Sequence, residues 1–503
     1  MNRLALVSLT IAFFMLSGCH ETCQKGPGSA PVATTAQPDP APTGKTTWPL
    51  FGGTPSRNMV NPTDKGIPID WSIEPGKEKN ILWQADLGTK TYGGPIVARG
   101  KVYVGTNNKK PRDKKLVDSK GAPLNMSVLM AFDEETGKFL WQNAHPIPEE
   151  EVFNEVKDLG LFSTPAVDGD RIYYVLPDCV VVCAHADTGK VLWQYDMRKE
   201  FKVMPFHCGN CSPLVVGERV FVVTGNGTDE EGKVAKPDAP SFIALTKKGE
   251  LAWKSSLPGK NVIEGQWSNP AYGVINGKPQ VIFPGGDAVI YSFEPETGKL
   301  IWKFNCHPKQ ARKSVDAIEN YIVATPVIHD NKVFVGMGMY PDNPRANKSG
   351  YFLCIDAAKT GDVSLGSKDS ALVWAYGGII EPRPKQGRAA IFSRTISTCA
   401  IYDGLVYIPE ETGYMNCLDA KTGKSQWVHD FKTTIWGSSY YVDGHVYVGT
   451  EDGEIVIFQA GNKLKIVAKI DMDEGLNGTP VVAGGVLFVA TRTKLYAIAR
   501  KKS

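Results

Sequence analysis

The sequence has no excess of charge of either sign, because its 503 residues hold 56 Lys and Arg against 53 Asp and Glu, a formal net charge of +3. This balance gives no overall attraction to nucleic acid, and we expect no nucleic-acid partner. After residue 16, no apolar run approaches the length of about eighteen residues that a membrane-spanning helix needs. The chain contains no His-Glu-x-x-His and no Gly-x-Ser-x-Gly motif, so it offers neither of these hydrolase sites.

The N-terminus has the form of an export signal with a lipidation site. Arg3 precedes an apolar run over residues 4–16 that is too short to span a membrane as a mature helix. The run leads into Leu16-Ser-Gly-Cys19, and small residues before a cysteine match the lipobox of bacterial lipoproteins. We therefore predict a lipoprotein signal peptide over 1–18 and acylation of Cys19, with an ordinary cleaved signal as the alternative. Several acyl chains would anchor the protein stably, and we expect it on the periplasmic side of the outer membrane.

One pattern recurs through the rest of the chain. Ala131-Phe-Asp-Glu-Glu-Thr-Gly-Lys-Phe-Leu-Trp141 has copies at 184–193, 244–253, 292–302, 354–374 and 417–427. Alternating apolar runs precede each copy, and Gly, Asp and Asn mark tight turns between them, which is typical of short antiparallel strands. Each unit thus predicts four strands, here called A to D, and the tryptophan of strand D is a structural docking residue at Trp83, Trp141, Trp193, Trp253, Trp302, Trp374 and Trp427.

Eight units can be counted from the small residues that begin strand A, near positions 93, 163, 212, 268, 324, 397, 437 and 478. The last unit has no strand D, whereas Ile81–Leu87 is a strand D with no strands before it. We predict an all-β, eight-bladed β-propeller of four-stranded antiparallel blades, in which the N-terminal strand completes the C-terminal blade and closes the ring. The seventh unit lacks the tryptophan, so seven blades and a degenerate one are an alternative.

The repeated pattern resembles the tryptophan-docking motif of pyrroloquinoline-quinone (PQQ) propellers. That family includes quinoprotein alcohol dehydrogenases and BamB, a non-enzymatic outer-membrane assembly lipoprotein. Trp48-Pro-Leu-Phe-Gly-Gly53 also looks like the segment that precedes such propellers. We divide the chain into the signal peptide (1–18), a flexible Pro/Ala-rich linker (19–47), a pre-propeller segment (48–79) and a PQQ-like propeller (80–500). The repeat builds a scaffold rather than a site, so the resemblance specifies fold more closely than function.

Long links between strands gather on one side of the predicted propeller. B–C and D–A links emerge on the same face, here called the long-loop face, and many of them are long, whereas most other links are tight turns. Binding residues usually lie on loops that a rigid scaffold holds, so this face is the candidate functional surface. The resemblance agrees, since PQQ lies at the equivalent mouth in the quinoprotein dehydrogenases.

The resemblance also implies candidate residues for a quinone and a calcium ion. Thr224-Gly-Asn226 resembles the turn whose asparagine binds calcium in the dehydrogenases, and Asp178 lies where their acidic ligand would be. Glu264 falls near the position of their catalytic base. Calcium prefers several oxygen ligands, carboxylates among them. Each residue also has an ordinary interpretation, as a loop amide, a turn residue and a solvated carboxylate.

Three departures from the dehydrogenase pattern argue against a bound quinone. No two of the ten cysteines are adjacent, although those enzymes cover PQQ with a vicinal disulfide. The segment in which they carry a stacking tryptophan reads His207-Cys-Gly-Asn-Cys-Ser-Pro213, and Lys278 is the only cation near the expected basic position. Without stacking faces and a cation for the quinone carboxylates, we expect PQQ affinity to collapse.

The remaining cysteines suggest two further features. Cys208 and Cys211 form a Cys-x-x-Cys on the long-loop face, which favours a local disulfide in an exported protein; a redox-active pair and half of a metal site are the alternatives. Cys399 could meet Cys417 within one blade. Three cysteines stand where other blades have Ala or Ser, and we expect these to be core positions: Cys183, Cys354 and Cys417.

Two functions follow as hypotheses. The favoured one is a non-catalytic binding or scaffold protein of the cell envelope, of the BamB-like class, with no cofactor. Its partners would be the membrane, through the lipid, and envelope proteins or peptides at the long-loop face. The alternative is a PQQ- and Ca²⁺-dependent oxidoreductase for alcohols or sugars, with Asp178 and Asn226 on the calcium and Glu264 as base.

Overall fold

The computed structural model of the chain describes residues 46–307, 320–339, 349–380, 388 and 390–500. The predicted signal peptide, the lipidation site Cys19 and nearly all of the predicted linker lie outside the described residues. Residues 45–503 form one compact unit. None of the helices in the described ranges has the length and apolar character needed to cross a bilayer.

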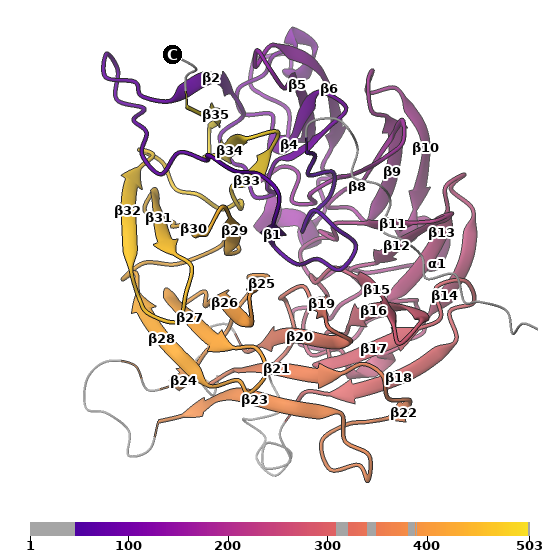
Figure 1. Cartoon of the computed structure of the whole chain (residues 1–503). Coiled ribbons are helices and arrows are strands. Elements are labelled where there is room, and N and C mark those ends of the chain that lie inside the picture. The colour runs from indigo at the N-terminus through magenta and orange to yellow at the C-terminus, as the bar shows by residue number, and fades with distance from the viewer. Residues whose placement is uncertain (1–45, 308–319, 340–348, 381–387, 389, 501–503) are drawn as a thin grey trace, which may run out of the picture. The chain divides into compact units, whose positions relative to one another are not determined.

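Eight antiparallel sheets form a ring, and each sheet is one blade (Figure 1). The strands of the first four blades are β3 (Ile96–Ala98), β4 (Lys101–Asn107), β5 (Met126–Asp133) and β6 (Phe139–Pro146); β7 (Ala166–Asp168), β8 (Arg171–Val175), β9 (Val180–His185) and β10 (Val191–Asp196); β11 (Leu214–Val216), β12 (Arg219–Val223), β13 (Phe242–Thr246) and β14 (Leu251–Ser255); and β15 (Ala271–Ile275), β16 (Lys278–Pro284), β17 (Val289–Phe293) and β18 (Leu300–Asn305).

The other four blades follow the same A-to-D order. Their strands are β19 (Val327–His329), β20 (Lys332–Met337), β21 (Tyr351–Asp356) and β23 (Leu372–Ile379); β25 (Ala400–Tyr402), β26 (Leu405–Pro409), β27 (Tyr414–Asp419) and β28 (Ser425–Asp430); β29 (Tyr440–Val442), β30 (His445–Gly449), β31 (Glu454–Gln459) and β32 (Ile466–Asp471); and β33 (Val481–Ala483), β34 (Val486–Ala490), β35 (Lys494–Ile498) and β2 (Ile81–Asp86). The eight-bladed propeller predicted from the repeats is confirmed, and the seventh blade has four regular strands.

Three short strands extend particular sheets. The insertion in the fifth blade forms β22 (Gly361–Asp362), which pairs in parallel with β18 of the fourth blade. A fifth strand, β24 (Ala390–Phe392), follows β23 in its own blade, and β1 (Val60–Asn61) pairs in parallel with β29. Helix is sparse: apart from short 3₁₀ turns, the described chain has one helix, α1 (Met197–Phe201).

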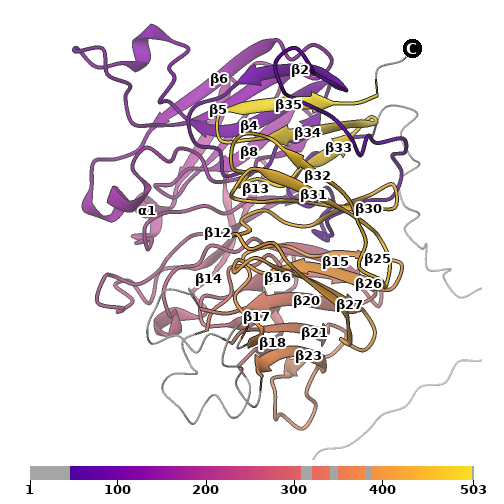
Figure 2. The ribbon, with the colours of Figure 1, turned by 90° about the vertical axis from the view of Figure 1, so that its left-hand side faces the viewer.

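The ring is closed by the two ends of the described chain, as predicted. β2 pairs antiparallel with β35, with Trp83 opposite Ala497, and the two strands lie side by side in both views of the ribbon (Figures 1 and 2). Every blade therefore has both neighbours, and no blade face is left uncovered. This is why strands B and C, for example β12 and β31, are buried nearly throughout and read as continuous Val, Ile and Phe runs.

The repeated tryptophans join many of the blades to the next one, whereas the indole N–H of Trp302 donates to Gln280 of its own blade at 2.9 Å. The indole N–H of Trp83 donates to the carbonyl of Glu134 at 3.1 Å, and an added Cβ at Gly137 would lie 2.6 Å from the same indole. The same close approach of turn glycine to indole recurs between Trp141 and Gly189, Trp193 and Gly249, Trp253 and Gly298, and Trp374 and Gly423. The Thr-Gly-Lys turns thus need glycine for two reasons, a positive φ and the lack of a side chain.

The tryptophan also explains the small residue in the neighbouring strand. In seven blades it faces a small side chain across the C–D pair, and this position holds Ala131, Cys183, Ala244, Ser292, Cys354, Cys417 and Ala497. The three cysteines predicted as core residues are all buried there. In the seventh blade Ala468 takes the place of the tryptophan, opposite Ile457. The next blade has no C–D turn on which a tryptophan could dock, because its strands C and D come from the two ends of the propeller.

The segment before the propeller, over 48–61, lies across the inner ends of the blades. Its main chain bonds to the innermost strands on several sides of the ring, from Trp48 with Val97 to Met59 with Tyr441. Arg57 at its centre is fully buried and donates four hydrogen bonds, to the carbonyl oxygens of Phe51, Ser212, Pro213 and Pro270. We call residues 48–61 the axial segment, and its end at β1 is seen near the middle of the ring in Figure 1.

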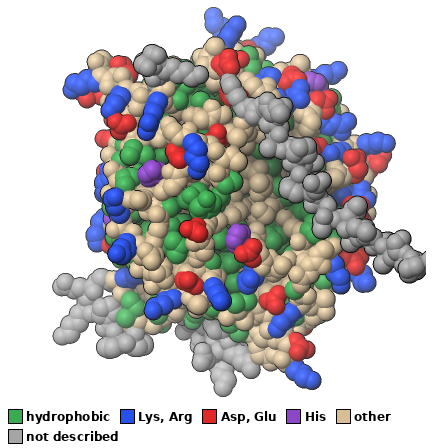
Figure 3. All heavy atoms as spheres, viewed as in Figure 1, with side chains coloured by type: hydrophobic (Ala, Val, Ile, Leu, Met, Phe, Trp, Pro, Cys, Tyr) green, Lys and Arg blue, Asp and Glu red, His purple; other side chains and the backbone are tan. Residues whose placement is uncertain are grey.

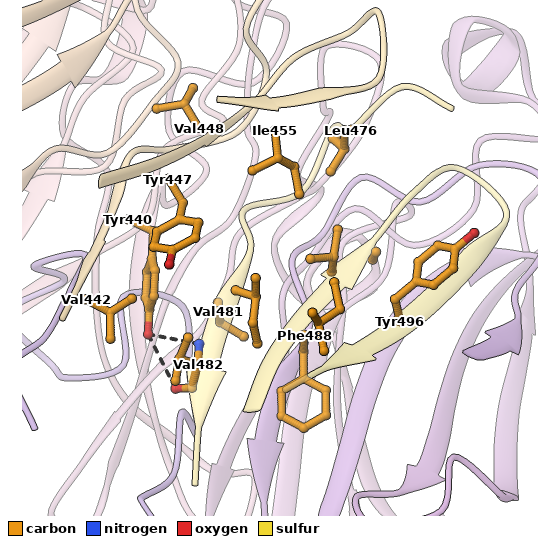
Figure 4. Close-up of a cluster of buried hydrophobic side chains, with 14 of the residues drawn as sticks. Tyr440, Val442, Tyr447, Val448, Ile455, Leu476, Val481, Val482, Phe488 and Tyr496 are labelled. Atoms are coloured by element: carbon orange, nitrogen blue, oxygen red, sulfur yellow. Dashed lines mark hydrogen bonds between the residues drawn. The ribbon is translucent and has the colours of Figure 1, made fainter. Parts of the chain in front are cut away.

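The hydrophobic core continues from blade to blade around the ring. Between the seventh and eighth blades it contains Val448, Ile455, Val481 and Phe488 (Figure 4). The Tyr440 hydroxyl accepts from the N–H of Val482 at 2.9 Å, so even the buried polar group at this seam has a partner. Acidic and basic side chains are interspersed on the face that Figure 3 shows, in line with the small net charge.

Candidate functional site

A cavity of about 650 Å³ lies where the D–A links converge. All eight D–A links contribute to its lining, and among the residues that the structure describes only Phe51 of the axial segment comes from elsewhere. The cavity therefore opens on the long-loop face and has the axial segment as part of its floor. Its volume is within the range of small-molecule sites, about 300–1,000 Å³. The predicted functional face is thus the one that carries this cavity.

Aromatic rings form two walls of the cavity. On one side Tyr92 lies 4.9 Å from Phe162 and 6.3 Å from Trp436, measured between ring centroids. On the other side Trp267 lies 5.9 Å from Phe206 and 6.1 Å from Tyr321. These rings come from six different D–A links, so only the closed ring brings them together. They present rigid, largely apolar surfaces to a ligand.

One cation lies among the described residues of the lining. The guanidinium of Arg394 is 5.7 Å from the ring centroid of Tyr321 and its Nε is 3.1 Å from Oε2 of Glu411, with both side chains buried. Glu264 lies near Tyr321 on the same side. Burial raises the pKa of Tyr321, and the carboxylate of Glu264 adds to the rise, so the phenol stays protonated at neutral pH.

Three buried polar atoms of the lining residues have no hydrogen-bond partner: Oδ1 of Asn210, Oδ1 of Asn477 and the indole nitrogen of Trp436. Asn269, a fourth polar lining residue, is fully engaged, because it accepts from the N–H of Ser212 at 2.5 Å and donates to Thr325 at 2.7 Å. These three atoms have almost no accessible surface, so they lie behind the cavity wall rather than facing a ligand.

The three residues that the resemblance implied for a metal and a base are not gathered in the cavity. Glu264 lines it, whereas Asp178 and Asn226 do not. The Asn226 side chain is fully buried and already engaged, accepting from the N–H of Met204 at 3.1 Å and donating to the carbonyl of Lys236 at 3.0 Å. Its oxygen is therefore held in the loop rather than offered to an ion.

Asp178 lies in the turn between β8 and β9, and its charged neighbours are Asp196, Arg198 and Glu150. Burial raises the pKa of its carboxyl to about 6. Within the described ranges, no group of three His, Cys, Asp or Glu side chains is placed to hold a metal ion. The described oxygens therefore do not fit a calcium ion beside a quinone in the cavity, and we derive no step through either group.

Contrary to expectation, the cavity contains both an aromatic stacking face and a cation. Lys278 lies at the exposed start of β16, and it is Arg394, from the link before β25, that enters the lining. Trp267 supplies an aromatic face, and the ring of His207 lies parallel to it, within 2°, at 6.5 Å between centroids. The resemblance to the dehydrogenases indicates residues in only some of the links, whereas all eight links line the cavity.

A simple sequence signal would have found lining residues in seven of the eight links. In seven of the eight units, the residue directly before the small residue that begins strand A lines the cavity, and these are Tyr92, Phe162, Trp267, Val323, Ile396, Trp436 and Asn477. The rule holds because strand A is the innermost strand, so the residue that enters it lies beside the axis. In the third unit the buried Cys211 takes this place, and Asn210 lines the cavity instead.

The predicted Cys208–Cys211 disulfide is not formed. Cys208 packs against Phe153 and Val156 beside the cavity, whereas Sγ of Cys211 accepts from the N–H of Val223 at 3.3 Å in a separate core cluster. Burial raises the pKa of both thiols to about 12, which removes the thiolate that redox exchange needs. Cys399 and Cys417 are likewise free thiols, in two different clusters.

The comparisons with known proteins agree with the fold. A family model described as "Outer membrane protein assembly factor BamB" matches residues 125–373 and 359–501. The chain belongs to this family. Among solved structures, the BamB-family chain resembles BamB from Moraxella catarrhalis, with a TM-score of 0.53 and 12% identity over 84% of this chain and 98% of that one. It also resembles a europium-containing methanol dehydrogenase, with a TM-score of 0.61 and 13% identity over 90% and 98%. At these identities the likeness shows the fold alone.

Curated relatives are enzymes. The dehydrogenase subunit of a quinone alcohol dehydrogenase from Gluconacetobacter polyoxogenes is 25% identical over 68% of this chain and 47% of its own length. The chain thus spans about half the length of this relative. A tetrathionate hydrolase from Acidithiobacillus ferrooxidans is 22% identical over 89% of this chain and 93% of its own. One repeat scaffold therefore carries different chemistries, and function has to be argued from the site.

Proposed function

We propose that this BamB-family propeller is a non-catalytic binding protein of the cell envelope, which takes a ligand into the cavity of the long-loop face. The observation that supports it best is the cavity itself, which residues of all eight D–A links line and which has aromatic rings on two sides. A rigid ring holds these groups in place before any ligand arrives, which lowers the entropic cost of binding. The long links around the cavity would meet envelope proteins or peptides.

The second part of the proposal is the tether. Acylation of Cys19 would attach the protein to the periplasmic side of the outer membrane, and residues 20–47 would let the propeller move relative to the bilayer. Metabolic labelling with a fatty acid, compared between the wild-type chain and Cys19→Ser, tests this part. Loss of both label and membrane association in the variant is expected. A membrane-bound but unlabelled wild-type protein would contradict it.

Binding without catalysis is favoured by how the ionisable groups of the cavity are engaged. Arg394 is paired with the buried Glu411, and Tyr321 is held in its protonated form. The three residues implied for calcium and proton abstraction are divided between the cavity and its surroundings. A reaction would need a base and an electrophile aimed at one point, which this division does not provide.

A quinoprotein oxidoreductase is the second candidate, because the curated relatives include quinone alcohol dehydrogenases and the cavity contains Trp267, Arg394 and Glu264. If PQQ were held there, it would supply the hydride acceptor for an alcohol or sugar. The described residues would then contribute an aromatic face, a cation and a carboxylate.

One experiment separates the two candidates. The purified full chain is incubated with PQQ and Ca²⁺, desalted, and examined for the quinone chromophore and for reduction of an electron-acceptor dye with a panel of alcohols and sugars. We expect neither. Stoichiometric quinone with dye reduction, lost in Glu264→Gln but kept in the exposed Glu218→Gln, would overturn the binding proposal.

A further inference from the structure

A positively charged loop lies on the long-loop face, separate from the cavity. It is the link between β4 and β5 of the first blade, and we call its residues 109–124 the basic loop, because they include six basic and two acidic side chains. We propose that the basic loop is a second membrane contact, which binds the anionic headgroups of a lipid bilayer. The inference rests on the proposed function in one respect, since the proposed tether brings a bilayer near.

The basic loop has a defined fold. Nδ2 of Asn108, a side chain only 3% exposed, donates to the carbonyls of Leu116 at 2.8 Å and Leu124 at 3.1 Å and so joins the two arms of the loop. The N–H of Leu124 donates to the same Leu116 carbonyl at 3.0 Å. The guanidinium of Arg112 lies 4.8 Å from the ring centroid of Phe139, which holds the loop against its blade. The backbone that carries the lysines is therefore ordered before a partner arrives, which lowers the entropic cost of binding.

Both carboxylates of the basic loop bond to its own backbone. Oδ1 of Asp113 accepts from the N–H of Lys115 at 2.9 Å, at the start of a short 3₁₀ turn. Oδ1 of Asp118 accepts from the N–H groups of Lys120 and Ala122, both at 2.8 Å. The two acidic side chains thus shape the turns of the loop, and neither forms an ion pair with a cation of the loop, all of which the structure describes.

Four exposed lysines give the basic loop its positive surface, and they are Lys110, Lys114, Lys115 and Lys120. No acidic side chain in the described ranges forms an ion pair with any of them, whereas Lys109 is paired with Asp158 at 2.8 Å. Glu474 is close enough to Lys110 for an electrostatic interaction without an ion pair. Since the protein compensates these four charges so little, an anionic surface that approaches the loop is attracted to it.

An exposed leucine makes a bilayer a better partner than a soluble polyanion. The Leu124 side chain is 37% exposed, and its backbone lies beside that of Leu116, directly after Lys115. At a bilayer, an apolar side chain among lysines can enter the boundary between headgroups and acyl chains while the ammonium groups stay among the headgroups. A soluble acidic polymer offers charge but no apolar layer, so it would leave Leu124 in water.

The described chain begins at the blade next to the basic loop. In the A–B turn of the eighth blade, the N–H of Gly484 donates to Oγ1 of Thr46 at 2.7 Å, and Arg112 of the basic loop donates to the carbonyl of Asp86 in the same blade. This A–B turn lies on the face opposite to the long-loop face, about 23 Å away for a strand as long as the seven-residue β4. The 26 residues from 20 to 45 can span up to about 90 Å. An acylated Cys19 would thus lie within reach of a bilayer that touches the basic loop.

Co-sedimentation with vesicles tests the inference on the full chain carrying Cys19→Ser, so that no acyl anchor contributes. Neutral phosphatidylcholine vesicles are compared with vesicles of equal parts phosphatidylcholine and phosphatidylglycerol. The test variant changes the four exposed lysines of the basic loop to glutamine. The matched control makes the same change of charge in C–D turns on the opposite face, with Lys138→Gln, Lys190→Gln, Lys248→Gln and Lys421→Gln.

We expect the protein to bind the acidic vesicles and not the neutral ones, and to be released by high salt. Each lysine near an anionic surface contributes about fivefold to binding, so the four-lysine variant should bind at least about a hundredfold more weakly while the control still binds. Leu124→Gln should weaken binding to the vesicles further than it weakens binding to soluble polyglutamate. Circular dichroism and melting of each variant verify that a loss of binding does not come from unfolding.

Several results would overturn the inference: no binding to acidic vesicles, equal binding to neutral ones, or equal loss in the two four-lysine variants. Polyglutamate that binds as tightly as the acidic vesicles, with no effect of Leu124→Gln on either, would identify an acidic polymer as the partner instead of a bilayer. Failure of the proposed tether has a different signature, because the fatty-acid label reports on Cys19 alone and the vesicle assay is made without that residue.

Discussion

Replacing Arg57 with methionine should destabilise the whole propeller, because this one side chain joins the axial segment to two blades. Its guanidinium donates to Phe51 at 2.7 Å within the segment, to Pro270 at 2.8 Å, and to Ser212 and Pro213 at 3.0 and 3.2 Å. All four acceptors are backbone carbonyls, so no carboxylate balances the charge among them. Methionine keeps much of the volume and removes every donor.

The size of the effect follows from two opposing contributions. Burial lowers the pKa of Arg57 from 12.5 to about 10, which corresponds to about 3 kcal/mol against the charged form. Hydrogen bonds from a charged donor contribute about 1.5–3 kcal/mol each, so four of them exceed this cost. Removal of the side chain also leaves four buried carbonyls without a donor. A net loss of about 3–5 kcal/mol in the free energy of unfolding is expected, comparable to breaking a buried pair.

Urea unfolding followed by tryptophan fluorescence measures this loss. Arg99→Met is the control, because Arg99 pairs with Asp187 at the surface, where such pairs contribute about 1 kcal/mol or less. Equal destabilisation by the two variants, or a loss below about 1 kcal/mol in Arg57→Met, would refute the view that the axial segment is held by this buried hub.

Three other predictions address the blade contacts, a buried carboxyl and the thiols. Gly189→Ala should lower the free energy of unfolding by about 1–3 kcal/mol more than Gly444→Ala. Both glycines have a similar positive φ, but only the Cβ added at Gly189 would meet a tryptophan, at 2.6 Å. Equal melting temperatures of the two variants would contradict this. Asp178→Asn should raise the free energy of unfolding by about 1–3 kcal/mol at pH 7.5 and by little at pH 4. The pKa of Asp178 is about 6 in the folded protein and 3.8 in the unfolded chain, so the stability that protonation gives the wild type is lost as the pH rises through 6. A difference between the two proteins that does not change with pH would contradict this. Cys208 and Cys211 should resist a thiol reagent in the native protein and both alkylate after non-reducing denaturation, whereas a mass consistent with a disulfide would contradict the free thiols.

The fold was predictable because a short repeated sequence pattern specifies its main strand pairings and blade contacts. The spacing between a small residue, the Thr-Gly-Lys turn and the tryptophan fixes one C–D pair, and the same indole then docks on the next turn, as between Trp83 and Gly137. The number of repeat units was sufficient to predict eight blades. The unmatched strand at Ile81–Leu87 was sufficient to predict that the N-terminal strand closes the ring. Each of these predictions used only residues that are close in sequence or that occupy equivalent positions in different repeat units.

The cavity could not be predicted in the same way, because its residues are neighbours only after the ring has closed. Arg394 and Trp267 belong to links more than a hundred residues apart, and nothing in either link indicates the other. The axial segment was recognised by resemblance but its place across the blades was not, since Arg57 bonds to backbone carbonyls that have no sequence signature. The predicted Cys208–Cys211 disulfide is not formed because the two cysteines, although close in sequence, are buried in different clusters.

The seventh blade shows how closure and the axial segment depend on one another. The seventh blade has Ala468 in place of the tryptophan, and the eighth blade has no C–D turn on which an indole could dock. The seam between these two blades therefore lacks the contact seen, for example, between Trp83 and Gly137. This seam is joined by the axial segment instead: β1 adds to the inner edge of the seventh blade, and Asn61 donates to the carbonyl of Val482 in the eighth at 3.1 Å. The Tyr440 hydroxyl bonds the same residue from the seventh blade. The segment that forms part of the cavity floor therefore also joins the seventh and eighth blades, so a change that releases it should loosen the cavity and this seam together.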